Sequence, residues 1–146
     1  MTRTDVILLD DAYQHRYVKP GVNILLVDYH RLIVYDELLP AGRLREPLTE
    51  KNRADIVIVT KCPNEMKPIE YRVITKAMDL YPYQQLFFTT IEYGKLQPLF
   101  KAGNPRGLQE MNDDNVLLLS GIGSPQQLTN DLSPYCNHIT PLAFSD

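Results

Sequence analysis

Five short apolar runs punctuate the chain, at residues 6–9, 22–27, 56–60, 86–90 and 116–119. They are rich in Val, Ile, Leu and Phe, and none of them alternates cleanly between apolar and polar positions. Because strands of a parallel sheet are covered on both faces, continuous runs of this kind are typical of buried parallel strands. The pattern therefore predicts strands in a covered, mostly parallel sheet.

Helical periodicity is clearest at residues 68–81, PIEYRVITKAMDLY. One helical face there would carry Ile69, Val73, Ile74, Ala77 and Leu80. Further along, Ser124 and Pro125 are typical of an N-cap followed by the first helical turn. Strands that alternate with helices predict an α/β fold in which helices flank the sheet.

Two segments interrupt this alternation, at residues 28–53 and 91–114. Long irregular connections in compact domains are usually functional or disordered, and the apolar content of residues 28–53 argues against disorder. Residues 91–114 are rich in Gly and Pro, which predicts a strand-containing excursion that ends in a turn. We expect residues 1–146 to form one α/β unit, with 28–53 as a long functional connection within it.

Composition narrows the class of protein. The chain has 146 residues, of which 44% are hydrophobic and 23% charged, as in an ordinary globular domain. A net charge of -3 argues against a general nucleic-acid binder. The two cysteines, Cys62 and Cys136, have no metal-ligand spacing, which favours a reducing compartment. Neither a signal peptide nor a membrane-spanning run is expected, although the protein could still lie against a membrane.

The sequence DDAYQHR at residues 10–16 directly follows the first apolar run. Carboxyl ends of parallel strands face the ligand crevice, and an apolar strand ending in Asp has the form of a Walker B element, whose carboxylate holds Mg²⁺. Two adjacent carboxylates repel each other unless a cation or hydrogen-bond donors offset the repulsion. The alternative is a solvated strand end with ordinary turn residues, and the short motif alone favours that alternative.

Three motifs in order make the pattern more specific: DDAYQHR, LLPAGRLREPL at residues 38–48, and RADIVIVTK at residues 53–61. Together they resemble the tetraacyldisaccharide 4'-kinase family, the lipid A 4'-kinases of Gram-negative bacteria. GIGSPQQL at residues 121–128 and FSD at residues 144–146 extend the resemblance. It implies a layered architecture like that of P-loop NTPases and Rossmann folds.

The chain departs from the family pattern in two respects. Ala12 stands where the family has a glycine, and no G-x-x-x-x-G-K-[ST] phosphate-binding loop occurs anywhere in the sequence. The resemblance is therefore to a C-terminal portion of the kinase that lacks the Walker A region. We expect this portion alone to be inactive and to need the missing N-terminal P-loop portion as its partner.

The resemblance also implies roles for individual residues. Asp10 would bind Mg²⁺ and, with Asp146, the nucleotide cofactor, while Asp11, Gln14 and His15 would be catalytic and Arg43 and Arg45 would bind the substrate. The alternative for the two arginines is an ion pair with Glu46 or Glu50, and Tyr13 is expected to pack inward. Thr60 and Lys61 resemble the strand-end Thr-Lys of nucleotide-binding folds, which is a weak signal.

The implied reaction transfers the γ-phosphate of ATP, with Mg²⁺, to the 4'-hydroxyl of tetraacyldisaccharide 1-phosphate, which gives lipid IVA. The resemblance places such an enzyme at the cytoplasmic face of the inner membrane as a peripheral protein that meets a lipid substrate and no nucleic acid. Two alternatives stay open: an inactive α/β module that only binds a ligand or partner, and an unrelated metal-dependent hydrolase that uses Asp10 and Asp11.

Overall fold

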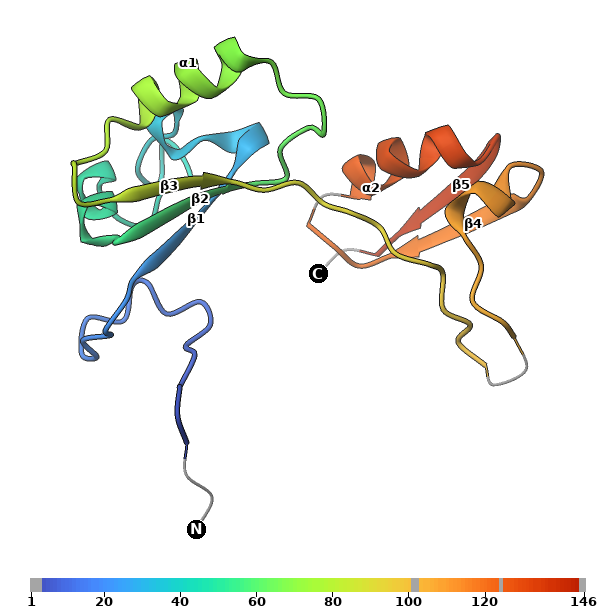
Figure 1. Cartoon of the computed structure of the whole chain (residues 1–146), viewed down its shortest axis with the longest axis horizontal. Helices are drawn as coiled ribbons and strands as arrows, with labels where there is room; N and C mark the ends of the chain where they lie inside the picture. Colours follow the sequence, from blue (N-terminus) through green and yellow to red (C-terminus); the bar gives the residue numbers. More distant parts are fainter. Residues whose placement is uncertain (1–3, 101–102, 124, 145–146) are drawn as a thin grey trace. The chain divides into compact units, whose positions relative to one another are not determined.

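A computed structural model of the chain describes residues 4–100, 103–123 and 125–144 (Figure 1). Its contacts group into two compact units, Met1–Ile91 and Glu92–Asp146. Each unit has a parallel sheet accompanied by an α-helix, which confirms the predicted α/β class. The grouping describes contacts and does not test whether residues 1–146 act as one unit of a larger kinase, which stays a prediction.

The sheet of the first unit contains strands β1 (Ile24–Asp28), β2 (Ile56–Thr60) and β3 (Gln85–Phe88). The strands are parallel and lie in the order β1-β2-β3. Helix α1 (Pro68–Met78) follows β2 and crosses one face of this sheet (Figure 1). The apolar runs at 22–27, 56–60 and 86–90 and the helical periodicity at 68–81 thus predicted real elements.

The core of this unit lies between the sheet and α1. Val57 and Val59 of the central strand and Met78 of the helix are fully buried, because alternate strand residues point toward the helix. The opposite face of β1 is open among the described residues, where Ile24 is 50% and Leu26 64% exposed. The prediction that these strands are covered on both faces is therefore wrong for β1 in the described part of the chain.

A second prediction from the apolar pattern is also wrong: residues 6–9 do not form a strand. They run as an extended segment away from the sheet, and Val6 is 74% and Leu8 90% exposed (Figure 1). A strand satisfies its backbone groups only through a neighbouring strand, and no described strand pairs with these residues. Apolar composition reports a preference for burial and carries no information about whether a partner strand is present.

The long connection at residues 28–53 is ordered and contains three 3-10 helices, η1 (Tyr29–Arg31), η2 (Ile33–Tyr35) and η3 (Leu48–Arg53). Tyr29, Leu32, Ile33 and Val34 pack against the core of the unit. This anchoring explains why so long a connection has a defined path. The remaining part, residues 36–47, lies between η2 and η3 and carries the arginines predicted to bind the substrate.

The second unit has two parallel strands, β4 (Asn115–Ser120) and β5 (His138–Ala143). Helix α2 (Pro125–Leu132) and the 3-10 helices η4 (Leu108–Met111) and η5 (Ser133–Tyr135) complete it. Its small core consists of Leu108, Met111, Leu132 and Cys136. The run at 116–119 predicted β4, but β5 was not predicted, and Ser124, the predicted N-cap, lies outside the described residues.

Among the residues that the structure describes, no helix is both long enough and apolar enough to cross a membrane.

Candidate functional site

Asp10 and Asp11 form an exposed turn and do not end a strand. The backbone N–H of Asp11 donates a hydrogen bond to Oδ1 of Asp10 at 3.0 Å, and Asp11 has a left-handed backbone with φ of 47°. Asp is one of the few residue types that adopts this region readily. The turn keeps both side chains in solvent, where their mutual repulsion is screened.

The pair supplies the kind of donor that Mg²⁺ prefers, since Mg²⁺ is usually bound by one or two carboxylates together with water and substrate phosphates. No group of three or more His, Cys, Asp or Glu side chains in the described part of the chain could hold a metal ion. Asp10 and Asp11 are therefore suited to supply the one or two carboxylate ligands of a magnesium–phosphate site. The described residues do not form a metal site built from protein side chains alone. Asp146, the other predicted cofactor residue, lies outside the described residues.

Gln14 and His15 lie in the turn that follows. The backbone N–H of His15 donates to the carbonyl of Ala12 at 2.9 Å, and both Gln14 and His15 are exposed. All four predicted acidic, amide and imidazole groups of DDAYQHR are thus accessible from solvent. Their catalytic roles stay predictions.

Tyr13 fastens this segment to the rest of the unit. Its hydroxyl donates to the carbonyl of Glu50 at 2.7 Å, and the Arg53 guanidinium lies 4.5 Å from its ring centroid. Arg53 Nη1 also donates to the Tyr13 carbonyl at 3.0 Å. The ring packs against the core, as predicted, and burial raises the pKa of the phenol.

A cluster of four charges surrounds this contact, and we call Arg16, Glu46, Glu50 and Arg53 the four-charge cluster. Nη2 of Arg16 lies 3.0 Å from Oε1 of Glu46 and 3.1 Å from Oε2 of Glu50. On the other side, Nη2 and Nε of Arg53 lie 2.7 Å from Glu46 Oε2 and Glu50 Oε2 respectively. The cluster joins the three sequence motifs, because Arg16, Glu46 and Arg53 each belong to a different one.

The cluster also shows which arginines pair with Glu46 and Glu50. Sequence alone offered them as partners for Arg43 and Arg45, but they pair with Arg16 and Arg53. Arg43 and Arg45 are exposed, and neither side chain forms an ion pair with any residue that the structure describes. Two guanidinium groups on this loop thus remain available to an external anion.

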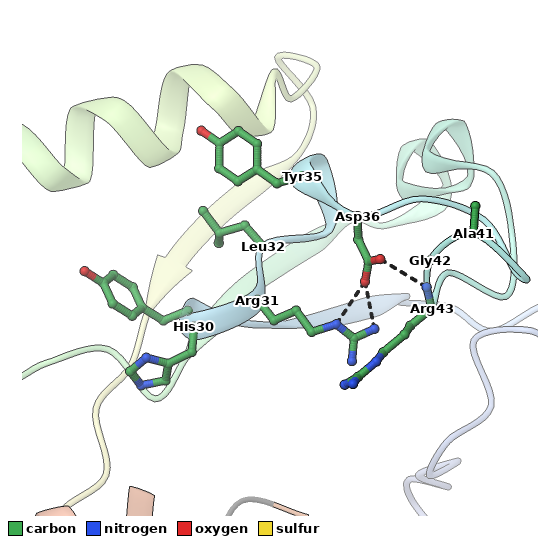
Figure 2. A pocket seen from close by; sticks show the side chains of 9 residues that line it. His30, Arg31, Leu32, Tyr35, Asp36, Ala41, Gly42 and Arg43 are labelled. Atoms are coloured by element: carbon green, nitrogen blue, oxygen red, sulfur yellow. Dashed lines mark hydrogen bonds and ion pairs between the residues drawn. The ribbon is translucent and has the colours of Figure 1, made fainter.

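The Asp36 carboxylate organises the loop that carries these arginines (Figure 2). Its Oδ1 accepts from the backbone N–H of Arg43 at 3.0 Å and of Glu37 at 2.9 Å. Its Oδ2 lies 2.9 Å from Nε and 2.8 Å from Nη2 of Arg31. The Arg43 N–H and the Arg31 guanidinium hold the pKa of Asp36 below its ordinary value. No pattern in the sequence indicated this role beyond the position of Asp36 just ahead of the LLPAGRLREPL motif.

Backbone hydrogen bonds close the same loop. Gly42 N–H donates to the carbonyl of Leu38 at 2.9 Å, and Leu44 N–H donates to that of Glu37 at 2.9 Å. A Cβ on Gly42 would overlap the Glu37 carbonyl oxygen and lie 2.6 Å from Asp36 Oδ1. The loop therefore needs glycine for space at this position, because the turn folds back on its own backbone.

The loop borders an open hollow of about 740 Å³ between η1, η2 and residues 41–43 (Figure 2). His30, Arg31 and Arg43 contribute nitrogen donors to its wall, and Tyr35 adds an aromatic ring that is 72% exposed. Leu38 and Leu39 are 43% and 62% exposed nearby on the same loop. Exposed apolar side chains and guanidinium groups thus lie on the same loop, and Arg45 lies outside the wall of the hollow.

A further polar contact lies at the carboxyl ends of β1 and β2. Lys61 Nζ lies 2.5 Å from Asp28 Oδ2, and Asp28 Oδ1 accepts from the His30 N–H at 2.9 Å. Burial acts to raise the pKa of Asp28, but Lys61 and the His30 N–H outweigh it, so the pKa is lowered. Lys61 has a left-handed backbone with φ of 58°. The resemblance of Thr60 and Lys61 to nucleotide-binding folds stays a prediction, and the contact of Lys61 with Asp28 was not predicted.

Comparison with known proteins covers the whole chain. Residues 1–146 match the family model described as tetraacyldisaccharide-1-P 4'-kinase. The chain is 65% identical over 144 residues to a tetraacyldisaccharide 4'-kinase of Phocaeicola vulgatus, covering 98% of this chain and 39% of the relative. It is 53% identical over 150 residues to the protein of that name from Bacteroides thetaiotaomicron, covering 97% of this chain and 40% of the relative.

A more distant protein of the same name, from Flavobacterium johnsoniae, is 42% identical over 124 residues, which cover 85% of this chain and 36% of the relative. No solved structure was found to match. The chain spans about two fifths of the length of the relatives from Phocaeicola vulgatus and Bacteroides thetaiotaomicron, with 39% and 40% of their lengths covered.

Proposed function

This chain belongs to the tetraacyldisaccharide-1-P 4'-kinase family, and we propose that it is part of an enzyme that phosphorylates the 4'-hydroxyl of tetraacyldisaccharide 1-phosphate. The product would be lipid IVA and the phosphoryl donor ATP. The observation that carries the proposal is the loop of residues 36–45, which is fixed by Asp36 and presents Arg43 and Arg45 without intramolecular ion pairs among the described residues. Family membership indicates which substrate that loop would bind.

Arg43 and Arg45 are proposed to bind the anionic head of the lipid. A guanidinium group is planar and can donate two parallel hydrogen bonds to a phosphate. The Asp36 clamp holds the Arg43 backbone, so less conformational freedom is lost when the side chain binds its ligand. The exposed side chains of Leu38 and Leu39 are suited to contact the apolar part of the same amphipathic molecule.

The DDAYQHR turn is proposed to bind the phosphoryl donor and its Mg²⁺ ion. When bound, Mg-ATP would supply the transferred phosphoryl group together with a cation that neutralises its charge. Asp10 would contribute a carboxylate oxygen toward that cation, with Asp11 as a second acidic group and Asp146 on the nucleotide. Gln14 and His15 are proposed to orient the reacting groups by hydrogen bonding.

Phosphate binding needs a further part of the protein. The G-x-x-x-x-G-K-[ST] motif does not occur in this sequence, and the relatives are much longer than the match. We propose that the rest of a longer kinase supplies the phosphate-binding loop. The enzyme would act at the cytoplasmic face of the inner membrane, where a water-soluble donor meets a lipid acceptor.

The test is phosphate transfer by a full-length kinase that contains this chain. Mg-ATP labelled at the γ-phosphate and tetraacyldisaccharide 1-phosphate in detergent micelles should give labelled lipid IVA. The Arg43→Ala and Arg45→Ala variants should raise KM for the lipid while KM for ATP stays near the wild-type value. Equal losses toward both substrates, or no product from the wild-type enzyme, would contradict the proposal.

A binding module without activity is the second candidate. The exposure of residues 6–9, an apolar segment with no paired strand in the described chain, fits a surface that associates with another polypeptide. The same phosphate-transfer assay separates the two, because a binding module would give no lipid IVA at any enzyme concentration.

A further inference from the structure

The four-charge cluster does more than neutralise charge on the surface of the first unit. The hydrogen bonds and ion pairs that join residues 10–16 to the rest of the described unit all involve Tyr13 or Arg16. Every one of these contacts ends on Glu46, Glu50 or Arg53. The position of the DDAYQHR turn therefore depends on one small group of side chains.

The same group of side chains is directly attached to the loop of residues 36–45, which carries Arg43 and Arg45 and is called the arginine loop below. Glu46 follows Arg45 in the chain and is three residues from Arg43. It accepts from Arg16 at 3.0 Å through one carboxylate oxygen and from Arg53 at 2.7 Å through the other. One carboxylate thus links the end of the acidic turn to the end of the arginine loop.

We propose that Glu46 and Arg53 are positioning residues that set the separation between the Asp10–Asp11 turn and the Arg43–Arg45 loop. The proposal rests on the proposed function, in which the first of these binds Mg-ATP and the second binds the lipid. In-line transfer requires donor and acceptor to be aligned, and a misplacement of about 1 Å can cost on the order of 100-fold in rate. In this proposal the cluster acts on the reaction only through the positions of the turn and the loop.

Burial supports a defined geometry for this cluster. The side chains of Glu46, Glu50 and Arg53 are 18%, 25% and 32% exposed, whereas that of Arg16 is 58% exposed. Exposed single pairs are mobile and weak, but charges that share partners in a partly buried network hold one arrangement. Tyr13, which is packed on the core beneath Arg53, ties the arrangement to the sheet.

The shape of arginine is essential at position 53. Its guanidinium contacts both carboxylates, the Tyr13 carbonyl and the Tyr13 ring at once. A lysine ammonium keeps the charge but is a compact donor without the planar fork, so it cannot make all four contacts. Arg53→Lys therefore tests geometry at constant net charge.

The experiment compares Arg53→Lys with Arg72→Lys in the full-length kinase. Arg72 is an exposed residue of α1 for which the structure shows no ion pair with any described residue, so its replacement is a matched control. In Arg53→Lys, amide hydrogen exchange should accelerate in residues 10–16 while β2 keeps its protection. In the same variant kcat should fall on the order of 10-fold to 100-fold, with KM for each substrate changed less than threefold. Arg72→Lys should match the wild type.

Arg16→Gln provides a second variant, chosen because Arg16 is the most exposed member and its loss leaves the core intact. Combining it with Glu46→Gln should cost less in kcat than the sum of the two single changes, since the two residues share one ion pair. Additive losses, unchanged kcat, or faster exchange throughout the first unit would overturn the positioning role.

Asp10→Asn, measured in parallel, separates this proposal from the proposed function. Loss of turnover in Asp10→Asn with normal kcat and normal local exchange in Arg53→Lys means that the positioning role alone has failed. Normal turnover in Asp10→Asn means that the assignment of the acidic turn has failed, and the positioning role falls with it.

Discussion

Replacement of Gly42 by alanine tests whether the arginine loop has the closed shape on which its function would depend. Gly42 does not have a positive φ, so alanine meets no backbone penalty there and only space decides the outcome. The new Cβ would overlap the carbonyl oxygen of Glu37 and would lie 2.5 Å from its nitrogen and 2.6 Å from Asp36 Oδ1. Two of these three atoms belong to the backbone, so the turn itself must move.

The expected loss of stability in Gly42→Ala follows from the backbone atoms that have to shift. Forcing backbone to move around an added methyl group costs about 1–3 kcal/mol, which outweighs the gain of about 0.4–1 kcal/mol that Gly→Ala gives at an unstrained position. A shifted turn also breaks the bond from the Arg43 N–H to Asp36 and moves the Arg43 side chain. Loss of one charge-assisted contact costs about 1.5–3 kcal/mol, which is about 10-fold to 150-fold in KM for the lipid.

The assay measures thermal unfolding and initial rates of lipid phosphorylation for a full-length kinase that contains this chain. Gly21→Ala is the control, because a Cβ at Gly21 meets no atom within 4 Å, so both Tm and KM should stay near wild type. For Gly42→Ala we expect a lower Tm and a lipid KM raised at least tenfold, with KM for ATP unchanged. A variant as stable and as active as the control would refute the closed-loop argument, since the clash would then be absent in solution.

Three further outcomes are expected. Asp10→Asn should lower kcat on the order of 100-fold or more with the fold retained, as loss of an electrostatic stabiliser does, and normal turnover at low Mg²⁺ would exclude Asp10 as the metal ligand. Arg43→Ala and Arg45→Ala should leave Tm nearly unchanged, because neither side chain has an ion-pair partner among the described residues, and a large drop in Tm would show a structural role instead. Asp28→Asn should lower Tm more at pH 7 than at a pH well below 3.8: the pKa of Asp28 is below its ordinary 3.8 in the folded chain, so the stabilisation by Lys61 is fully present above pH 3.8 and is lost as the pH falls through the folded value. A Tm difference that is the same at both pH values would contradict this.

Local periodicity predicted those parts of the fold that depend on local sequence. Residues 56–60 match β2 in full, and α1 begins at Pro68 as its pattern indicates. The helix ends three residues early, at Met78, because Asp79 adopts a left-handed C-cap with φ of 44°. Such a cap is usually glycine or asparagine, so the aspartate at position 79 did not indicate that the helix ends there.

Predictions that needed a distant partner were less successful. Residues 6–9 have as strong an apolar run as 116–119, yet only the second forms a strand, because β5 pairs with it. The sequence of β5, HITPLA, was missed because it contains proline, which argues against a strand. Pro141 is tolerated because β5 pairs with β4 alone in the described residues and so lies at a sheet edge.

Charge pairing could not be assigned from the sequence for a related reason. Glu46 and Glu50 lie closest in sequence to Arg43, Arg45 and Arg53, and proximity alone cannot choose among these three. The choice depends on η3, whose turn places Glu50 and Arg53 three residues apart on one side, and on Tyr13, which is 40 positions away from Arg53. A long-range contact thus decided which arginines were left for a ligand.

The role of Arg16 shows why a motif match assigns chemistry less reliably than it assigns family. DDAYQHR was interpreted through its acidic, amide and imidazole groups, yet its last residue, Arg16, pairs with Glu46 and Glu50. A turn that has to hold exposed carboxylates in place needs an anchor, and Arg16 and Tyr13 provide it from within the same seven residues. The same argument applies to LREP, where Arg45 is exposed and the adjacent Glu46 is engaged on both carboxylate oxygens. Each motif therefore combines groups that are free to act with groups that fix their position, and only the contacts distinguish the two kinds.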